Sequence, residues 1–238
     1  MQTQFSLRLL FELIFPGLCL LCSHPAETKM PLCSRCLEKL EWLKDNCCQI
    51  CGLGFAPTSP AHLCGKCQLK PPSYHLARAV VKFEEPAVEI VHRFKYQREF
   101  AFLAWMSDEM AGVYQEQFAP LDFDLIIPVP LHWQRLLKRG YNQSQLLARF
   151  LAKKINLPLA PSVLVRTQNT PPQVGLSRNQ REKNLKKAFL VKKPSWIKDK
   201  KVLLIDDVIT TGATIEEASR TLKRAGAELV GVLAFARA

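Results

Sequence analysis

The chain has 238 residues, of which 48% are hydrophobic and 23% charged, with 33 basic against 21 acidic side chains. This ordinary globular composition excludes a disordered, collagen-like or coiled-coil chain and predicts one or two domains. No apolar stretch reaches the roughly 20 residues that span a bilayer. The net charge of +12 favours an anionic partner, which can be a nucleic acid, a phosphorylated metabolite or an acidic membrane surface.

The segment 9–22 is apolar enough to imitate a signal peptide. Glu12 interrupts it, Pro16 and Gly17 break it, and no small-residue cleavage site follows. We therefore expect a cytoplasmic protein that opens with a short amphipathic helix. Its apolar face would carry Leu7, Leu10, Phe11 and Ile14.

All nine cysteines lie between residues 19 and 67, and eight of them form four Cys-x-x-Cys pairs. The pairs are Cys19/Cys22, Cys33/Cys36, Cys48/Cys51 and Cys64/Cys67. This spacing aims two sulfurs at one tetrahedral metal ion, whereas a reducing cytoplasm disfavours disulfides and a redox motif would explain only one pair. We therefore predict two zinc ions and leave Cys47 as a spare thiol. The simplest partition joins the first pair with the second and the third with the fourth, but an interleaved partition also fits the spacing.

Four thiolates per ion leave no open coordination position, so both zinc ions are expected to be structural. A segment this short buries little apolar surface, and zinc ligation, worth about 10–16 kcal/mol in finger peptides, would hold it together. Two consecutive prolines, Pro71 and Pro72, end the cysteine-rich region. We place a boundary there, between a domain at 1–72 and a domain at 73–238.

From residue 73 the chain alternates strand and helix patterns. We expect strands at 79–83, 124–129, 163–165, 201–206 and 229–235, and helices at 87–96, 102–114, 142–155 and 214–225. Continuous apolar strands alternating with helices indicate an α/β fold with a doubly wound parallel sheet. Because ligands bind beyond the carboxyl ends of such strands, the residues that follow Ile127 and Ile205 form the candidate site.

The residues after Ile205 combine two acids with a small-residue loop, and they read Asp206, Asp207, Val208, Ile209, Thr210, Thr211, Gly212, Ala213 and Thr214. Small residues at a helix N-terminus leave N–H groups free for an anion, which the helix dipole also favours. The two acids upstream suit sugar hydroxyls or a hydrated metal ion, so the pattern predicts a phosphorylated-sugar site. The alternative is ordinary helix capping, in which Thr214 and Glu217 form a capping box. Capping alone leaves the doubled aspartate unexplained.

Three stretches of this sequence carry a family resemblance. Residues 202–214 resemble the phosphoribosyl-pyrophosphate motif of type I phosphoribosyltransferases. Residues 127–143 and the segment around Gln173, Leu176, Arg181, Asn184 and Phe189 are similar to the ComF/GntX family of bacterial competence proteins. Together with the cysteine pairs, this similarity covers nearly the whole chain. It implies a double zinc ribbon followed by a type I phosphoribosyltransferase-like domain.

The resemblance also implies ligand contacts. Asp206 and Asp207 would hold the ribose hydroxyls of phosphoribosyl pyrophosphate (PRPP), residues 210–214 its 5′-phosphate, and Mg²⁺ would accompany the ligand. The turn at 128–131 takes the place that binds pyrophosphate in these transferases. Its prolines donate nothing, so donors are expected from Val129, Leu131 and His132, helped by Arg139. Arg139 can equally be a solvated charge at a helix end. No catalytic residue is recognisable.

Residues 166–201 contain eleven basic and two acidic side chains, a net of nine of the twelve positive charges. In type I transferases the corresponding region is a mobile loop that closes over the reacting sugar. The charge equally suits a nucleic-acid backbone or a solvated face. The candidate DNA contacts are Arg181, Lys183, Lys186 and Lys187.

Two functions compete on this reading. The family implies a role in natural transformation, in which the protein handles incoming single-stranded DNA, binds PRPP or a related sugar phosphate, and docks a helicase or another DNA-uptake protein through its zinc domain. The alternative is an active Mg²⁺-dependent phosphoribosyltransferase of unknown acceptor without a direct nucleic-acid role. We predict the first, and the sequence leaves open whether the protein catalyses a reaction.

Overall fold

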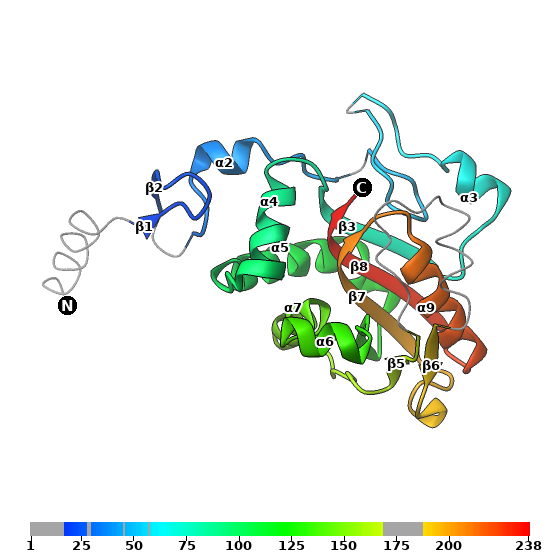
Figure 1. Cartoon of the computed structure of the whole chain (residues 1–238). Helices are drawn as coiled ribbons and strands as arrows, with labels where there is room; N and C mark the ends of the chain where they lie inside the picture. The colour runs from blue at the N-terminus through cyan, green and yellow to red at the C-terminus, as the bar shows by residue number, and fades with distance from the viewer. Residues whose placement is uncertain (1–16, 28–29, 45, 57, 169–187) are drawn as a thin grey trace, which may run out of the picture.

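A computed structural model describes residues 17–27, 30–44, 46–56, 58–168 and 188–238. At its centre lies a sheet of four parallel strands (Figure 1). Their spatial order is β3 (Leu76–Lys82), β8 (Leu229–Arg237), β7 (Lys201–Ile209) and β4 (Leu125–Pro128). The predicted parallel α/β fold is therefore confirmed. The amphipathic helix predicted over residues 7–14 lies outside the described residues.

Helices cover both faces of this sheet, as a doubly wound fold requires. On one face pack α5 (Ala101–Gln117) and α7 (Gln143–Ile155), and on the other α9 (Ala213–Arg224) (Figure 1). After residue 73 the described chain also contains α4 (Ala87–His92), the π-helix η1 (Arg93–Gln97), the 3₁₀ turns η2 (Ala119–Leu121) and η3 (Pro194–Trp196), and α6 (Trp133–Arg139).

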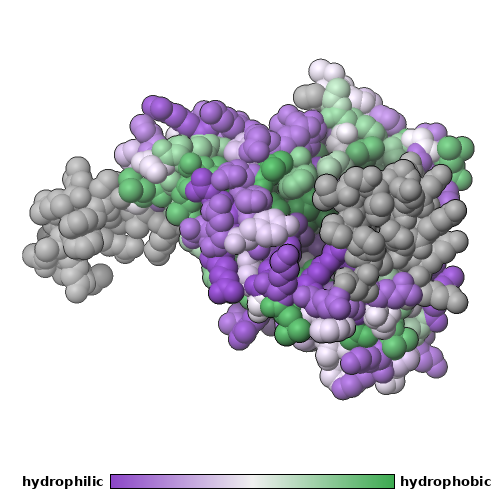
Figure 2. Space-filling view, viewed as in Figure 1, coloured by the Kyte–Doolittle hydropathy of each residue, from purple (hydrophilic) through white to green (hydrophobic). Residues whose placement is uncertain are grey.

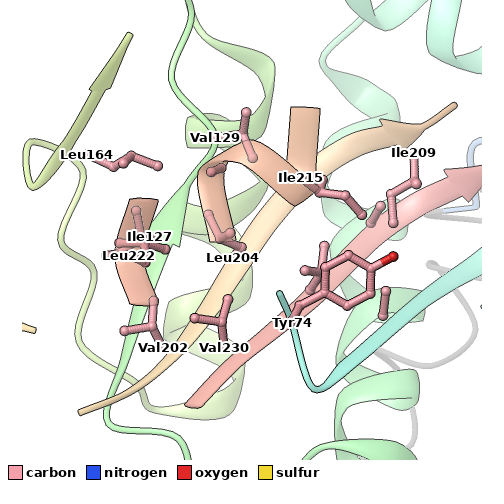
Figure 3. Packing of buried hydrophobic residues seen from close by; sticks show 14 of the residues in the cluster. Tyr74, Ile127, Val129, Leu164, Val202, Leu204, Ile209, Ile215, Leu222 and Val230 are labelled. Atoms are coloured by element: carbon pink, nitrogen blue, oxygen red, sulfur yellow. The ribbon is translucent and has the colours of Figure 1, made fainter. Parts of the chain in front are cut away.

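The alternating side chains of β7 show how one strand serves two cores. Val202 and Leu204 belong to the core under α9, where they meet Ile215 and Leu222 (Figure 3). Leu203 and Ile205 belong to the core under α5 and α7. Because both faces are apolar, the strand reads as a continuous hydrophobic run, which is why the sequence indicated a buried strand.

The cysteine-rich region lies along the outer edge of β3. It contains β1 (Gly17–Leu18), β2 (Pro25–Ala26), α2 (Ser34–Glu38) and α3 (Gly65–Leu69). Trp42 forms an antiparallel bridge with Val81, and the Ala77 N–H donates to the Ile50 carbonyl at 2.7 Å. Gly52 has φ +64°, and a Cβ there would lie 2.5 Å from the Ala77 carbonyl oxygen, so this approach requires glycine. The region thus covers a sheet edge that would otherwise be open to other strands.

Both halves of the chain share their cores. Cys48 and Cys67 lie in the core that contains α9, and Cys33 lies in the core that contains α5. The boundary between 1–72 and 73–238 remains a prediction, and across it the side chains pack continuously.

Two strand predictions need correction. The strand predicted at 163–165 is β5 (Leu164–Arg166), which pairs antiparallel with β6 (Phe189–Val191) outside the main sheet. The strand predicted at 201–206 continues to Ile209, because its backbone stays paired with β8 up to Arg237. Asp206 and Asp207 therefore lie inside β7 and not beyond its end.

Candidate functional site

The eight paired cysteines form two clusters of four. Cys19, Cys22, Cys33 and Cys36 make the first cluster, and Cys48, Cys51, Cys64 and Cys67 the second. Within each cluster all four sulfurs lie within 4.8 Å of one another. The geometry therefore joins the first pair with the second and the third with the fourth, and it excludes the interleaved partition. The Cys47 thiol stands apart from both clusters and donates to the Lys44 carbonyl at 3.4 Å.

Both clusters fit zinc. Zinc binds the thiolate form, and the protein favours that form at one cysteine of each cluster. Burial opposes ionisation of Cys48, but backbone N–H groups, including that of Cys64 at 3.4 Å from its Sγ, lower its pKa to about 6. Backbone donors outweigh burial in the same way at Cys19, whose pKa is also about 6. Four sulfurs per ion fill the tetrahedral shell, so these are structural sites.

Among the described residues, the loop between β7 and α9 has partners for its carbonyl groups but not for its first three amide groups. Arg237 donates to the carbonyls of Ile209 and Thr210, and Lys66 donates to the Thr211 carbonyl at 3.2 Å. In the described part of the chain, the N–H groups of Thr210, Thr211 and Gly212 donate to no other group. With its carbonyls held and its amides uncommitted, the loop has the polarity of an anion-binding turn.

The N-terminus of α9 does not have the predicted capping box. Its N-cap residue is Gly212, with φ +79° and no side-chain cap. Nothing lies within 4 Å of a Cβ placed there, so backbone conformation and not crowding requires glycine. Glu217 is buried and pairs with Arg220 at 2.7 Å. Thr214 lies inside α9 and is not its N-cap residue, so it does not open a capping box there.

The two aspartates of β7 are buried and hold different partners. Asp206 is 9% exposed, and its Oδ1 accepts from the Ser144 hydroxyl at 2.8 Å. Burial and the neighbouring charge of Asp207 raise the pKa of Asp206 to about 7. Asp207 is 7% exposed, and its Oδ2 lies 2.7 Å from Lys95 Nζ. Asp207 is thus already neutralised by a lysine.

The predicted pyrophosphate turn is only partly available for a ligand. The Val129 N–H donates to the Ile205 carbonyl at 2.9 Å, because the strand pairing continues one residue past β4. The prediction that the Val129 N–H donates to pyrophosphate is therefore wrong, because this N–H is already used in the sheet. His132 is buried, and its Nδ1 accepts from the Gln134 N–H at 3.4 Å as the N-cap of α6. Leu131 lies half-buried at this turn, and Arg139 ends α6 with its guanidinium 4.9 Å from the Tyr96 ring centre.

Three side chains next to the aspartates were missed by the sequence analysis. Ser144 and Lys95 are described above. Burial and the charge of Arg135 lower the pKa of Arg166 to about 10. The charge of Asp206 acts in the opposite direction, which shows that Arg166 lies near Asp206. They come from α7, η1 and β5, far apart in sequence, so no local motif could have identified them. The candidate DNA contacts Arg181, Lys183, Lys186 and Lys187 lie outside the described residues.

Among the helices that the structure describes, none has the length and apolar character needed to cross a membrane. 

Comparison with known proteins matches the chain to two family models. A double zinc ribbon domain matches residues 10–68, and a phosphoribosyl transferase domain matches residues 142–238. Among solved structures, a purine phosphoribosyltransferase from Pyrococcus horikoshii Ot3 aligns with 56% of this chain and 83% of its own, at 16% identity and a TM-score of 0.36.

Curated relatives match over almost their whole length. DNA utilization protein YhgH of Shigella flexneri is 34% identical over 230 residues, which cover 94% of this chain and 99% of the relative. Competence protein F of Haemophilus influenzae is 32% identical over 229 residues, which cover 93% of this chain and 91% of the relative. The chain therefore belongs to the ComF/GntX family of competence proteins, in which a double zinc ribbon precedes a phosphoribosyltransferase-like domain.

Proposed function

We propose that this protein acts in the cytoplasm in the uptake or use of incoming DNA, and that its phosphoribosyltransferase-like domain binds PRPP or a related sugar phosphate. The names of the two relatives, a DNA utilization protein and a competence protein, support the cellular role. The phosphate loop beside Asp206 and Asp207 supports the ligand.

The uncommitted amides of the loop carry the ligand proposal. A phosphate bound at residues 210–214 would accept hydrogen bonds from the N–H groups of Thr210, Thr211 and Gly212, which meet no other acceptor among the described residues. The α9 dipole, with its positive end at the loop, favours the same charge. Because Arg237 and Lys66 hold the opposing carbonyls, the loop needs no rearrangement to present its donors.

Ribose binding in this proposal requires an exchange of partners. Asp206 and Asp207 accept hydrogen bonds from the sugar hydroxyls, and Asp207 gives up its ion pair with Lys95 as it does so. In this proposal Arg139 and the Leu131 N–H donate to the pyrophosphate. Mg²⁺ prefers carboxylate and phosphate oxygens, and the paired aspartates beside a bound pyrophosphate provide that donor type. The ion would neutralise part of the charge of the pyrophosphate.

The DNA role has a separate basis. We propose that single-stranded DNA contacts the basic side chains Arg181, Lys183, Lys186 and Lys187, and that the zinc ribbons dock a helicase or another DNA-uptake protein. The net charge of +12 and the names of the relatives support this role.

Calorimetric titration of PRPP with Mg²⁺ tests the sugar-phosphate site. We expect the wild type to bind, and the Asp206→Asn/Asp207→Asn double variant to lose at least about tenfold in affinity because two acceptors become amides. Glu228→Gln serves as the matched control. Glu228 is exposed and directly precedes β8, at the end of the parallel sheet opposite to the loop. Equal affinity of the double variant and the wild type would contradict the ribose assignment.

A further inference from the structure

A second pocket is lined in part by Lys95, the lysine that pairs with Asp207. Five cationic side chains and two tyrosines line it, and no acidic residue of the described chain does. They are Lys95, Tyr96, Arg98, Arg135, Lys138, Arg139 and Tyr141. They come from two short segments, the end of η1 and the helix α6 with the turn after it.

The local backbone explains how the two segments meet. The π-helix η1 ends at Arg98, which adopts a left-handed conformation with φ +58°. On α6 the spacing of three and four residues places Arg135, Lys138 and Arg139 on one stripe. The Tyr141 hydroxyl donates to the Phe94 carbonyl and ties the turn after α6 to η1. The pocket is therefore built by fixed elements and not by a chance approach of surface lysines.

The positive charge of this pocket favours binding of an anion. Burial and the charge of Arg139 lower the pKa of Arg135, so the cations repel one another in the free protein. The Asp207 carboxylate pairs with Lys95. Hydrophilic side chains also gather over the neighbouring helix α4, on the face that Figure 2 shows. An extended anion with several charges matches five cations better than a single phosphate does.

Exposed aromatic rings border the same cations. Tyr96 is 63% exposed, and its ring already stacks under the Arg139 guanidinium. Phe100 is 43% exposed and meets the Tyr141 ring edge-on, with ring centres 5.1 Å apart. Large exposed aromatic rings beside cations are the combination that binds single-stranded nucleic acids, since the phosphates meet the charges and the unpaired bases stack on the rings.

We propose that the pocket between η1 and α6 binds a single-stranded nucleic acid, with phosphates at Arg98, Arg135 and Lys138 and a base stacked on Tyr96. The proposal deepens the DNA role given above and rests on it. It adds contacts from described residues to the candidate contacts at 181–187. The strand would pass next to the Lys95–Asp207 pair and so approach the sugar-phosphate site.

Fluorescence anisotropy with labelled dT20 at several salt concentrations tests the charge contacts. We expect Arg135→Gln/Lys138→Gln to reduce affinity about tenfold near 0.1 M salt. The slope of log affinity against log salt should fall by about 1.4, since each phosphate contact contributes roughly 0.7 on a single strand. Arg149→Gln/Lys153→Gln, which removes two exposed charges of α7 outside the pocket, should change neither. An unchanged slope in the first variant, or the same fall in both, would overturn the proposal.

The stacking contact has its own test. Tyr96→Ala should weaken dT20 binding about tenfold without changing the salt slope, and Tyr96→Phe should restore it because the ring remains. An abasic strand of the same length should bind both tyrosine variants and the wild type equally. Loss of abasic-strand binding in Tyr96→Ala, or full dT20 affinity in that variant, would contradict the stacking role.

Failure of this proposal can be told apart from failure of the proposed function. If the wild type does not bind dT20, both the DNA role and this surface are wrong. If the wild type binds dT20 and Arg135→Gln/Lys138→Gln binds it with the same affinity and salt slope, the DNA role stands and this surface alone is wrong. Lys95 and Arg139 belong both to this pocket and to the sugar-phosphate proposal, whereas Arg135 and Lys138 belong to this pocket alone. The PRPP titration of Asp206→Asn/Asp207→Asn changes no residue of this pocket, so its outcome is read separately.

Discussion

Asp206 illustrates a conflict between stability and ligand binding at a single residue. Its carboxylate is buried next to a second carboxylate, and its pKa of about 7 means that ionisation costs free energy in the folded protein. Ser144 and the Asp207 N–H compensate only part of that cost. An acid retained under such strain is typical of functional sites, where a ligand supplies the missing partner.

The first prediction concerns the pH dependence of stability at this residue. Because the folded pKa lies above the unfolded value, Asp206 stabilises the fold most below about pH 4, and this contribution is lost as the pH rises through 7. Asp206→Asn should therefore increase the free energy of unfolding at pH 8, by no more than about 4 kcal/mol, and flatten its profile between pH 4 and 7. Urea denaturation at several pH values measures both.

Asp124 provides a control of opposite sign. The Lys200 ammonium and the Lys201 N–H lower the pKa of Asp124, so its contribution is present at neutral pH and lost as the pH falls. Asp124→Asn should decrease stability at pH 8. A decrease at pH 8 in Asp206→Asn as well would contradict the account of Asp206 as a strained acid.

At the scale of elements, the two zinc ribbons differ in their relation to the phosphate loop. The second cluster shares its pocket with the loop, since Cys51 and Cys67 line the same hollow as Thr211 and Gly212. Lys66, next to Cys67, donates directly to the loop. The first cluster packs instead toward α4 and α5, and its Cys22 is exposed. Only the second zinc site is placed to shape the ligand loop.

This difference predicts different outcomes for two cysteine variants. Cys67→Ser and Cys22→Ser should each reduce bound zinc from two ions to one per chain, as measured by metal analysis. Cys67→Ser should weaken PRPP binding about tenfold, because Lys66 loses its anchor, whereas Cys22→Ser should leave the affinity within about a factor of two. Lys66→Met keeps both zinc ions and should still weaken PRPP binding. Unaltered affinity in Lys66→Met would show that the second ribbon does not act through this contact.

At the scale of the whole molecule, the sequence predicted the features that depend on local pattern. The cysteine spacing predicted the metal-binding region, and continuous apolar runs predicted all four parallel strands, because both are properties of a few neighbouring residues. The loop at 210–214 was found where α/β sheets bind ligands. The length of β7 was underestimated, because pairing with β8 keeps two aspartates in a strand that their intrinsic preference would end.

What the sequence could not predict depends on contacts between distant segments. Lys95, Ser144 and Arg166 reach the aspartates only after the sheet has formed. The seven residues of the basic pocket come from segments about forty positions apart, and nothing in either segment alone indicates the other. The placement of the second zinc cluster in the core under α9 likewise follows from tertiary packing, which no spacing rule contains.

The central claim is that the loop between β7 and α9 binds the phosphate of a sugar phosphate through its amides. Amide chemical shifts of the ¹⁵N-labelled, deuterated protein, recorded while PRPP and Mg²⁺ are added, test it most directly. The account predicts large, saturable shifts for Thr210, Thr211 and Gly212, smaller ones elsewhere, and none when ribose without phosphate is added instead. Saturation of binding with those three amides unmoved would contradict it.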